Sequence, residues 1–120
     1  MLSIPRGIRI FVAVEPTDMR KGIDGLGALV RTYGEDVFGG HLYVFLSRRR
    51  DRLKILAWDN GGFVVYYKRL EKGRFPAVFG EAGEATVQID AADLHLLLDA
   101  VDFRHLKRPK LWGPPKKNIA

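Results

Sequence analysis

Basic side chains gather around one turn of the chain, and their spacing fits the binding of phosphate groups. Arg48, Arg49 and Arg50 are consecutive and lie between two apolar runs. A β-ribbon with cations at its tips can lie along a nucleic-acid backbone or enter a major groove. The alternative is a solvated hairpin, although a merely soluble surface more often mixes the two signs of charge. The candidate nucleic-acid-binding residues of this block are Arg48, Arg49, Arg50, Arg52, Lys54, Lys68, Arg69, Lys72 and Arg74.

Aromatic residues are interleaved with these cations. Aromatic faces stack on the bases of single strands, so their presence keeps a single-strand or RNA-binding function open. The competing interpretation is that they belong to the core, and it is favoured because half of a strand's residues face inward. The residues concerned are Tyr43, Phe45, Trp58, Tyr66 and Tyr67.

A second pair of cations, Arg20 and Lys21, falls in what we predict to be the first turn of a helix. The helix dipole disfavours cations there, so the placement breaks a local rule. Backbone amides at a helix start, two cations and the small Gly22 together form a plausible phosphate anchor. The alternative is that a neighbouring acid, Glu15, Asp18 or Asp24, neutralises the pair.

The sequence shows no recognisable group of catalytic or metal-binding residues. The chain contains no cysteine, and its three histidines show no ligand spacing. Asp18, Asp51 and Asp59 fall at the edges of predicted elements, where caps and turns explain them. No nucleotide-binding or nucleophile motif occurs. We therefore expect no enzyme activity, no cofactor, no metal and no small-molecule ligand.

Charge is segregated along the chain. Residues 48–74 hold nine basic residues against three acidic ones, a net charge of +6. Residues 75–101 hold five acids and no base, and residues 102–120 hold six bases against one acid. Two basic blocks thus flank an acidic one, which is the pattern of an electrostatic footprint for an acidic partner.

At 120 residues and 47% apolar composition, the chain fits one compact domain. We expect that domain to span residues 1–103, with residues 104–120 forming a basic tail that is extended or disordered. Arg6 and Arg9 interrupt what would have to be the apolar core of a secretion signal, and no run approaches a membrane span. The expected location is the cytoplasm.

The spacing of apolar residues predicts the helices and strands that position the cations. Residues 8–14 predict a strand, and a helix over 19–33 follows, capped by Thr17 or Asp18. Its apolar stripe comprises Met19, Ile23, Leu26, Val30 and Tyr33.

Period-two patterns then predict three strands over residues 41–47, 52–59 and 63–70. Asn60-Gly61 is a strong hairpin signal, and the short connections require an antiparallel meander. A short strand over 85–89 and a helix capped by Asp90 complete the pattern. Leu94, Leu97, Leu98 and Val101 form the buried stripe of that helix. The predicted fold class is α+β, an antiparallel sheet of four to five strands packed with two helices.

Three stretches together resemble a known family. They are PTDMRKGIDGLGALV (16–30), GHLYVFLSRRRDRLKILAWDNGGFVVYYKRLEKGRFP (40–76) and LHLLLDAVDF (94–103). The chain resembles the TnpB, or second-open-reading-frame, accessory protein of the insertion-sequence 66 family of bacterial transposons. The positions matching the first signature are Asp18, Met19, Arg20, Lys21 and Gly22, and those matching the second are Arg52, Lys54, Trp58, Lys68, Arg69, Leu70, Glu71, Gly73, Arg74 and Phe75.

The resemblance implies a partner and a role. Such proteins are encoded beside a separate, larger transposase that carries the catalytic acids, so no catalytic residue transfers to this chain. With the basic blocks, it predicts a non-catalytic accessory protein for DNA transposition that binds transposon-end DNA or the transposase–DNA complex. Two alternatives stay open, a protein-interaction module that bridges transposase subunits and a module for single strands or RNA.

Overall fold

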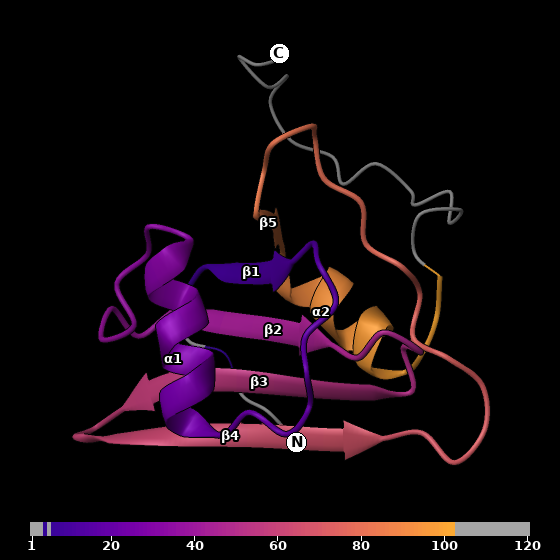
Figure 1. Cartoon of the computed structure of the whole chain (residues 1–120), viewed down its shortest axis with the longest axis horizontal. Helices are drawn as coiled ribbons and strands as arrows, with labels where there is room; N and C mark the ends of the chain where they lie inside the picture. Colours follow the sequence, from indigo (N-terminus) through magenta and orange to yellow (C-terminus); the bar gives the residue numbers. More distant parts are fainter. Residues whose placement is uncertain (1–3, 5, 103–120) are drawn as a thin grey trace.

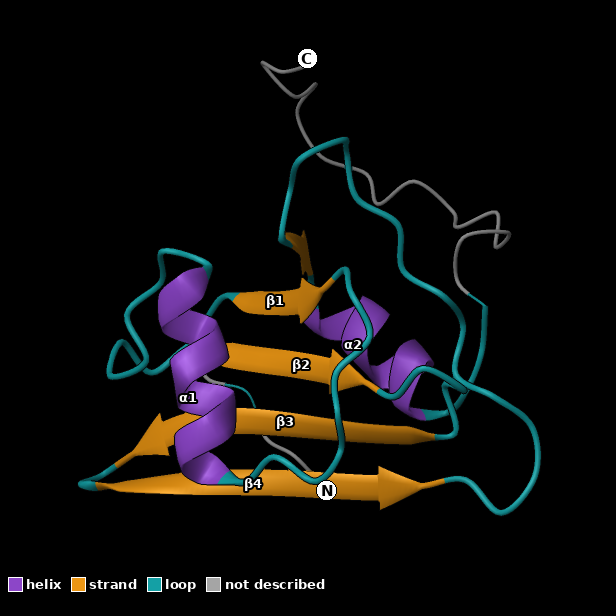
Figure 2. Cartoon of the chain, viewed as in Figure 1, coloured by secondary structure: helices purple, strands orange, loops and turns teal. Residues whose placement is uncertain are grey.

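The computed structural model describes residue 4 and residues 6–102, which form one five-stranded sheet with a helix on each face (Figures 1 and 2). The spatial order of the strands is β4-β3-β2-β1-β5. Their bounds are β1 Ile10–Ala13, β2 Leu42–Leu46, β3 Arg52–Asp59, β4 Gly62–Arg69 and β5 Thr86–Ile89, and the helices are α1 Ile23–Thr32 and α2 Ala91–Leu98. The predicted α+β class with five strands and two helices is confirmed.

The sheet is mixed rather than wholly antiparallel. The meander β2-β3-β4 is confirmed, and β5 also runs antiparallel to β1. The strands β1 and β2, however, are parallel, with Ile10 beside Leu42. The crossover through α1 explains this, because a long connection that contains a helix returns the chain in the same direction.

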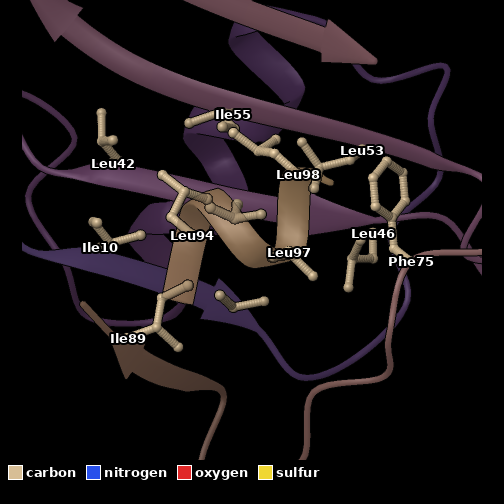
Figure 3. Packing of buried hydrophobic residues seen from close by; sticks show 12 residues of the cluster. Ile10, Leu42, Leu46, Leu53, Ile55, Phe75, Ile89, Leu94, Leu97 and Leu98 are labelled. Atoms are coloured by element: carbon tan, nitrogen blue, oxygen red, sulfur yellow. The ribbon is translucent and has the colours of Figure 1, made fainter. Parts of the chain in front are cut away.

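The two faces of the sheet carry separate hydrophobic clusters. On one face Leu26 and Val30 of α1 pack against Tyr43, Phe45 and Leu56. On the other face the leucines of α2 contact strand residues such as Ile10 and Ile55 (Figure 3). Because both faces are covered there, every residue of β2 is buried, which explains its uninterrupted apolar sequence.

Helix α1 begins later than the sequence predicts. Its first residue is Ile23, and Gly22 occupies the N-cap position without a side-chain cap. Neither Thr17 nor Asp18 caps the helix, because Thr17 is buried beside β2 and the Asp18 carboxylate is bonded to Arg20. The predicted stripe is correct at Leu26 and Val30, which are fully buried, and wrong at Ile23, which is 41% exposed.

The sequence correctly predicts the β3–β4 hairpin and the cap at the start of α2. Asn60 and Gly61 both have positive φ, as the predicted tight hairpin requires. The Asp90 carboxylate accepts a hydrogen bond of 2.7 Å from the Asp93 N–H and caps α2. Val101 lies beyond the end of α2 and is exposed rather than buried. The predicted tail, residues 104–120, lies outside the described residues.

Candidate nucleic-acid interface

Segments far apart in the sequence meet at one end of the sheet. The turn between β2 and β3 contains Arg48–Arg50, and the loop after β4 contains Lys72 and Arg74. The turn and the loop both lie at the right-hand end of the strands in Figure 1, and the loop that leads from β1 to α1 crosses in front of the strands. We call this region the basic end and define it by Arg20, Lys21, Arg48, Arg49, Arg50, Arg52, Lys54, Lys68, Arg69, Lys72 and Arg74.

An open hollow of about 380 Å³ lies within the basic end. One wall is the segment Thr17–Arg20, and the other is the β2–β3 turn with the start of β3. Two sequence groups that we predicted independently therefore share one concave surface. The arginines that line it are Arg20, Arg48, Arg49 and Arg52, and the acids are Asp18 and Asp51.

Arg20 is held in place by Asp18. The guanidinium donates from Nη2 to Asp18 Oδ2 at 2.7 Å and from Nε to both carboxylate oxygens at 3.1 Å. These side-chain bonds, with one from the Arg20 backbone N–H, hold the pKa of Asp18 far below its usual value, and the pKa of Arg20 is raised in turn. Neutralisation of Arg20 by an acid, one of our two alternatives, is what the geometry shows.

The helix-start anchor does not form as predicted. Arg20 and Lys21 precede the N-cap residue Gly22 rather than sitting in the first turn of α1. Arg20 nevertheless stays 91% exposed, and its guanidinium lines the hollow from a fixed position.

Lys54 has a structural role, because it joins β3 to the segment before α1. Its Nζ donates to the Met19 carbonyl at 2.8 Å and to the Lys21 carbonyl at 2.9 Å. The same atom lies 5.3 Å from the centre of the Tyr67 ring, within the range of a cation–π contact. These contacts fix the segment that carries Arg20, and they occupy the ammonium donors of Lys54.

Arg50 also has a structural role. Its backbone lies in the left-handed region, with φ of 58°. Its Nε donates to the Phe75 carbonyl at 2.9 Å, and the Phe75 N–H donates to the Arg50 carbonyl at 2.7 Å. The arginine turn is thereby tied to the loop after β4, and Phe75 is fully buried beneath it.

Two further cations have partners within the fold. Lys68 donates from Nζ to the Leu98 carbonyl at 2.6 Å, where a cation stabilises the C-terminus of α2. Arg69 forms an exposed ion pair of 3.0 Å with Glu71. Among the described residues, the exposed cations of the basic end that form no ion pair are Arg48, Arg49, Arg52, Lys72 and Arg74.

The acids of the region serve the fold. Asp51 accepts a hydrogen bond from the Ser47 hydroxyl at 3.2 Å, and its carbonyl accepts one from the Leu70 N–H. Asp59 lies at the opposite end of β3, where it pairs with Gly62 at the β3–β4 hairpin. Within residue 4 and residues 6–102, no three histidine or acidic side chains form a group that could hold a metal ion.

The aromatic residues divide between core and surface. Tyr43 and Phe45 are buried beneath α1, and burial raises the pKa of Tyr43 to about 12. Tyr66 packs on the α2 face, whereas Tyr67 is half exposed beside Lys54. The core interpretation is confirmed for Tyr43 and Phe45.

Trp58 belongs to the opposite end of the sheet. It forms edge-on contacts with Phe38 and Phe63, with ring centres 5.1 and 4.9 Å apart. Phe38 and Trp58 border a second, mostly apolar hollow of about 530 Å³. Phe38 was not among the aromatic residues predicted from the sequence, because it lies in a loop away from the cation block.

No helix in the described part of the chain is long and apolar enough to cross a membrane.

The fold and the basic end define a small α+β protein with a concave cationic surface.

Comparison with known proteins places it in a family. The model of the IS66 Orf2-like family, TnpB, matches residues 8–108, and the chain belongs to that family. Two proteins of Sinorhizobium fredii, "Uncharacterized protein y4jC" and "Uncharacterized protein y4hO", are 34% and 33% identical to it over 117 residues. Each alignment covers 97% of this chain and 98% of the relative. No solved structure matches. The family is an accessory one rather than a known catalytic one, and membership indicates an accessory role in transposition.

Proposed function

We propose that the chain supports transposition by binding the phosphate backbone of transposon-end DNA through its basic end. The observation that carries this proposal is the hollow, in which Arg20 from one segment faces Arg48, Arg49 and Arg52 from another. Four arginines outnumber the two acids of this lining, Asp18 and Asp51, so the hollow keeps an excess of positive charge. A bound polyanion would offset that excess, and fixed arginines suit the fork geometry of phosphate recognition.

Backbone contact accounts for the side chains better than base reading does. The residues that line the hollow belong to the segment 17–20, the β2–β3 turn and the start of β3, and none of them belongs to a helix. Contacts to phosphate position a protein on DNA without reading its sequence. The protein therefore adds affinity and orientation, and the transposase of the same element supplies the chemistry.

The transposase is the second proposed partner. The apolar hollow around Phe38 and Trp58 lies at the end of the sheet opposite the cations, and Phe38 is 58% exposed. Exposed aromatic surface of this kind is typical of protein-binding sites. A molecule with a DNA-binding end and a protein-binding end would join the transposase to its substrate.

The experiment compares two variants of equal net charge. Arg48→Glu with Arg49→Glu reverses two cations that line the hollow, whereas Arg6→Glu with Arg31→Glu reverses two exposed cations outside it. We expect the first variant to bind duplex DNA at least ten-fold more weakly than the second, at one fixed salt concentration. Equal affinity of the two variants would show that net charge alone, and not the basic end, attracts DNA.

A parallel capture experiment separates the two partners. Phe38→Ser should reduce capture of the transposase while leaving duplex affinity unchanged. If instead the Arg48/Arg49 variant keeps its DNA affinity and loses the transposase, the basic end is a protein-binding surface.

A further inference from the structure

The strand β4 forms one edge of the sheet and runs for eight residues. No described element lies beyond it (Figure 1). Long, regular edge strands are templates for pairing with another strand, and proteins usually shorten, bend or charge them. β4 contains no proline, and its register with β3 is continuous from Gly62 to Arg69.

The unpaired backbone groups of this edge follow from the register. The Leu70 N–H donates to the Asp51 carbonyl, and Arg69 lies opposite Arg52. Hydrogen-bonded and non-bonded pairs alternate in an antiparallel ladder, so even-numbered residues of β4 bond to β3. The residues that direct N–H and C=O outward are therefore Phe63, Val65, Tyr67 and Arg69.

Side chains along this edge leave apolar surface uncovered. Val64 is 48% exposed on the α2 face, and Tyr67 is 50% exposed on the α1 face. The cations that would discourage pairing, Lys68 and Arg69, stand only at the end of the strand. The middle of the edge therefore has both free backbone groups and apolar side chains on its two faces.

We propose that β4 pairs antiparallel with β4 of a second copy of this chain, about a two-fold axis at Tyr66. A parallel pair would set Arg69 beside Arg69, which like-charge repulsion disfavours. The antiparallel pair sets Tyr67 opposite Val65 of the second copy and Arg69 opposite Phe63 of the second copy. Aromatic–β-branched and cation–aromatic pairs of this kind stabilise sheets. The outward groups of all four odd-numbered residues then find partners, which makes the edge self-complementary.

The pairing has a geometric consequence. A two-fold axis perpendicular to the sheet keeps both α1 helices on one face of a ten-stranded sheet. With about 3.4 Å per residue along a strand and about 4.8 Å between strands, the two cationic hollows lie roughly 30 Å apart on that face. This distance is close to one turn of B-DNA, roughly 34–36 Å. Only this consequence rests on the proposed function, because the pairing itself needs no DNA.

The test measures mass and amide exchange on the full chain without DNA. Sedimentation equilibrium over a range of concentrations should show a species of twice the 13.6 kDa monomer mass. Amide exchange at Phe63, Val65, Tyr67 and Arg69 should slow as concentration rises, whereas Val64, Tyr66 and Lys68 stay protected throughout. A monomer at every concentration overturns the proposal. Protection of the odd-numbered amides that does not depend on concentration also overturns it, since residues of the same chain would then cover the edge.

A matched pair of variants checks the register. Tyr67→Pro removes an outward N–H without touching the ladder to β3, and Tyr67→Ala removes the same ring but keeps the N–H. We expect the proline variant to weaken self-association at least ten-fold relative to the alanine variant. Equal association of two variants that both fold would show that the contact lies elsewhere. If the proline variant fails to fold, the exchange pattern of the unaltered chain still decides the question.

Discussion

Replacement of Lys54 by methionine separates the structural cations from those available to a partner. Lys54 is one of the residues that sequence predicts to bind nucleic acid, yet its ammonium bonds two carbonyls of the segment 19–21. Methionine keeps most of the side-chain volume and removes the donors, so the change reports on those bonds.

The expected magnitude follows from the contacts. A hydrogen bond to a charged group contributes about 1.5–3 kcal/mol, and the two carbonyls lie near enough to the surface to regain water in part. We expect a loss of about 1.5–3 kcal/mol in the free energy of unfolding. At about 4 °C per kcal/mol for a chain of this size, Tm falls by about 6–12 °C.

The matched variant is Arg49→Met, at an exposed position with no ion pair among the described residues. Surface substitutions of this kind change stability by less than about 0.5 kcal/mol. The two variants should therefore differ in which measurement they change, the free energy of unfolding in urea or the salt dependence of DNA binding. Lys54→Met should lower the free energy of unfolding and leave the salt dependence nearly unchanged. Arg49→Met should leave the free energy of unfolding nearly unchanged and reduce the salt dependence. A stable Lys54→Met protein whose salt slope falls by about 0.9 would show that Lys54 contacts a phosphate and is not a structural cation.

Three further predictions concern the core, the Asp18–Arg20 pair and the C-terminal residues. Leu26→Ala should cost about 2–5 kcal/mol in urea unfolding, because Leu26 is fully buried between α1 and the sheet. The folded pKa of Asp18 lies below its usual value of 3.8, so its ion pair stabilises the protein above that pH, and this stabilisation is lost as pH falls toward the folded pKa. In Tm measured from pH 2 to 7, Asp18→Asn should remove this decline on the acid side. An identical decline in both proteins would contradict the pairing. Removal of residues 104–120 takes six cations from the chain and should weaken duplex binding while leaving Tm nearly unchanged; a large loss of Tm would show that these residues pack on the core.

Elements with strong local signals could be predicted from the sequence. The pair Asn60-Gly61 placed the β3–β4 hairpin, and Asp90 with Asp93 placed the start of α2. The period-two runs gave β3 with its observed bounds. In each case the deciding interaction lies within a few residues, so neighbouring sequence contains the information.

Features that depend on distant contacts could not be predicted. The parallel pairing of β1 with β2 needs the packing of α1, which spacing alone does not reveal. The helix begins at Ile23 rather than at residue 19, because the Asp18 carboxylate bonds the backbone N–H and the guanidinium of Arg20 in a separate turn before the N-cap residue Gly22. Competing local bonds of similar strength make such boundaries hard to place.

The candidate site was predicted in outline and not in detail. The density of cations located the basic end, but Arg50, Lys54 and Lys68 each bond a backbone carbonyl far away in the sequence. For Lys54 a signal existed, because alternation along β3 places it on the face that α1 covers, where an ammonium needs acceptors. Nothing comparable marks Arg50, whose partner Phe75 lies 25 residues away.

If exposed arginines of the hollow contact DNA phosphates, the salt dependence of duplex affinity must change when they are replaced. The measurement compares the unaltered chain with Arg48→Gln/Arg49→Gln and with the control Arg6→Gln/Arg31→Gln, from about 50 to 200 mM salt. At about 0.9 per phosphate contact, losing two contacts should flatten the log–log slope by about 1.8 in the first variant, and the control should keep the original slope. An unchanged slope in the Arg48/Arg49 variant, or an equal change in the control, would contradict the assignment of the basic end as the DNA-binding surface.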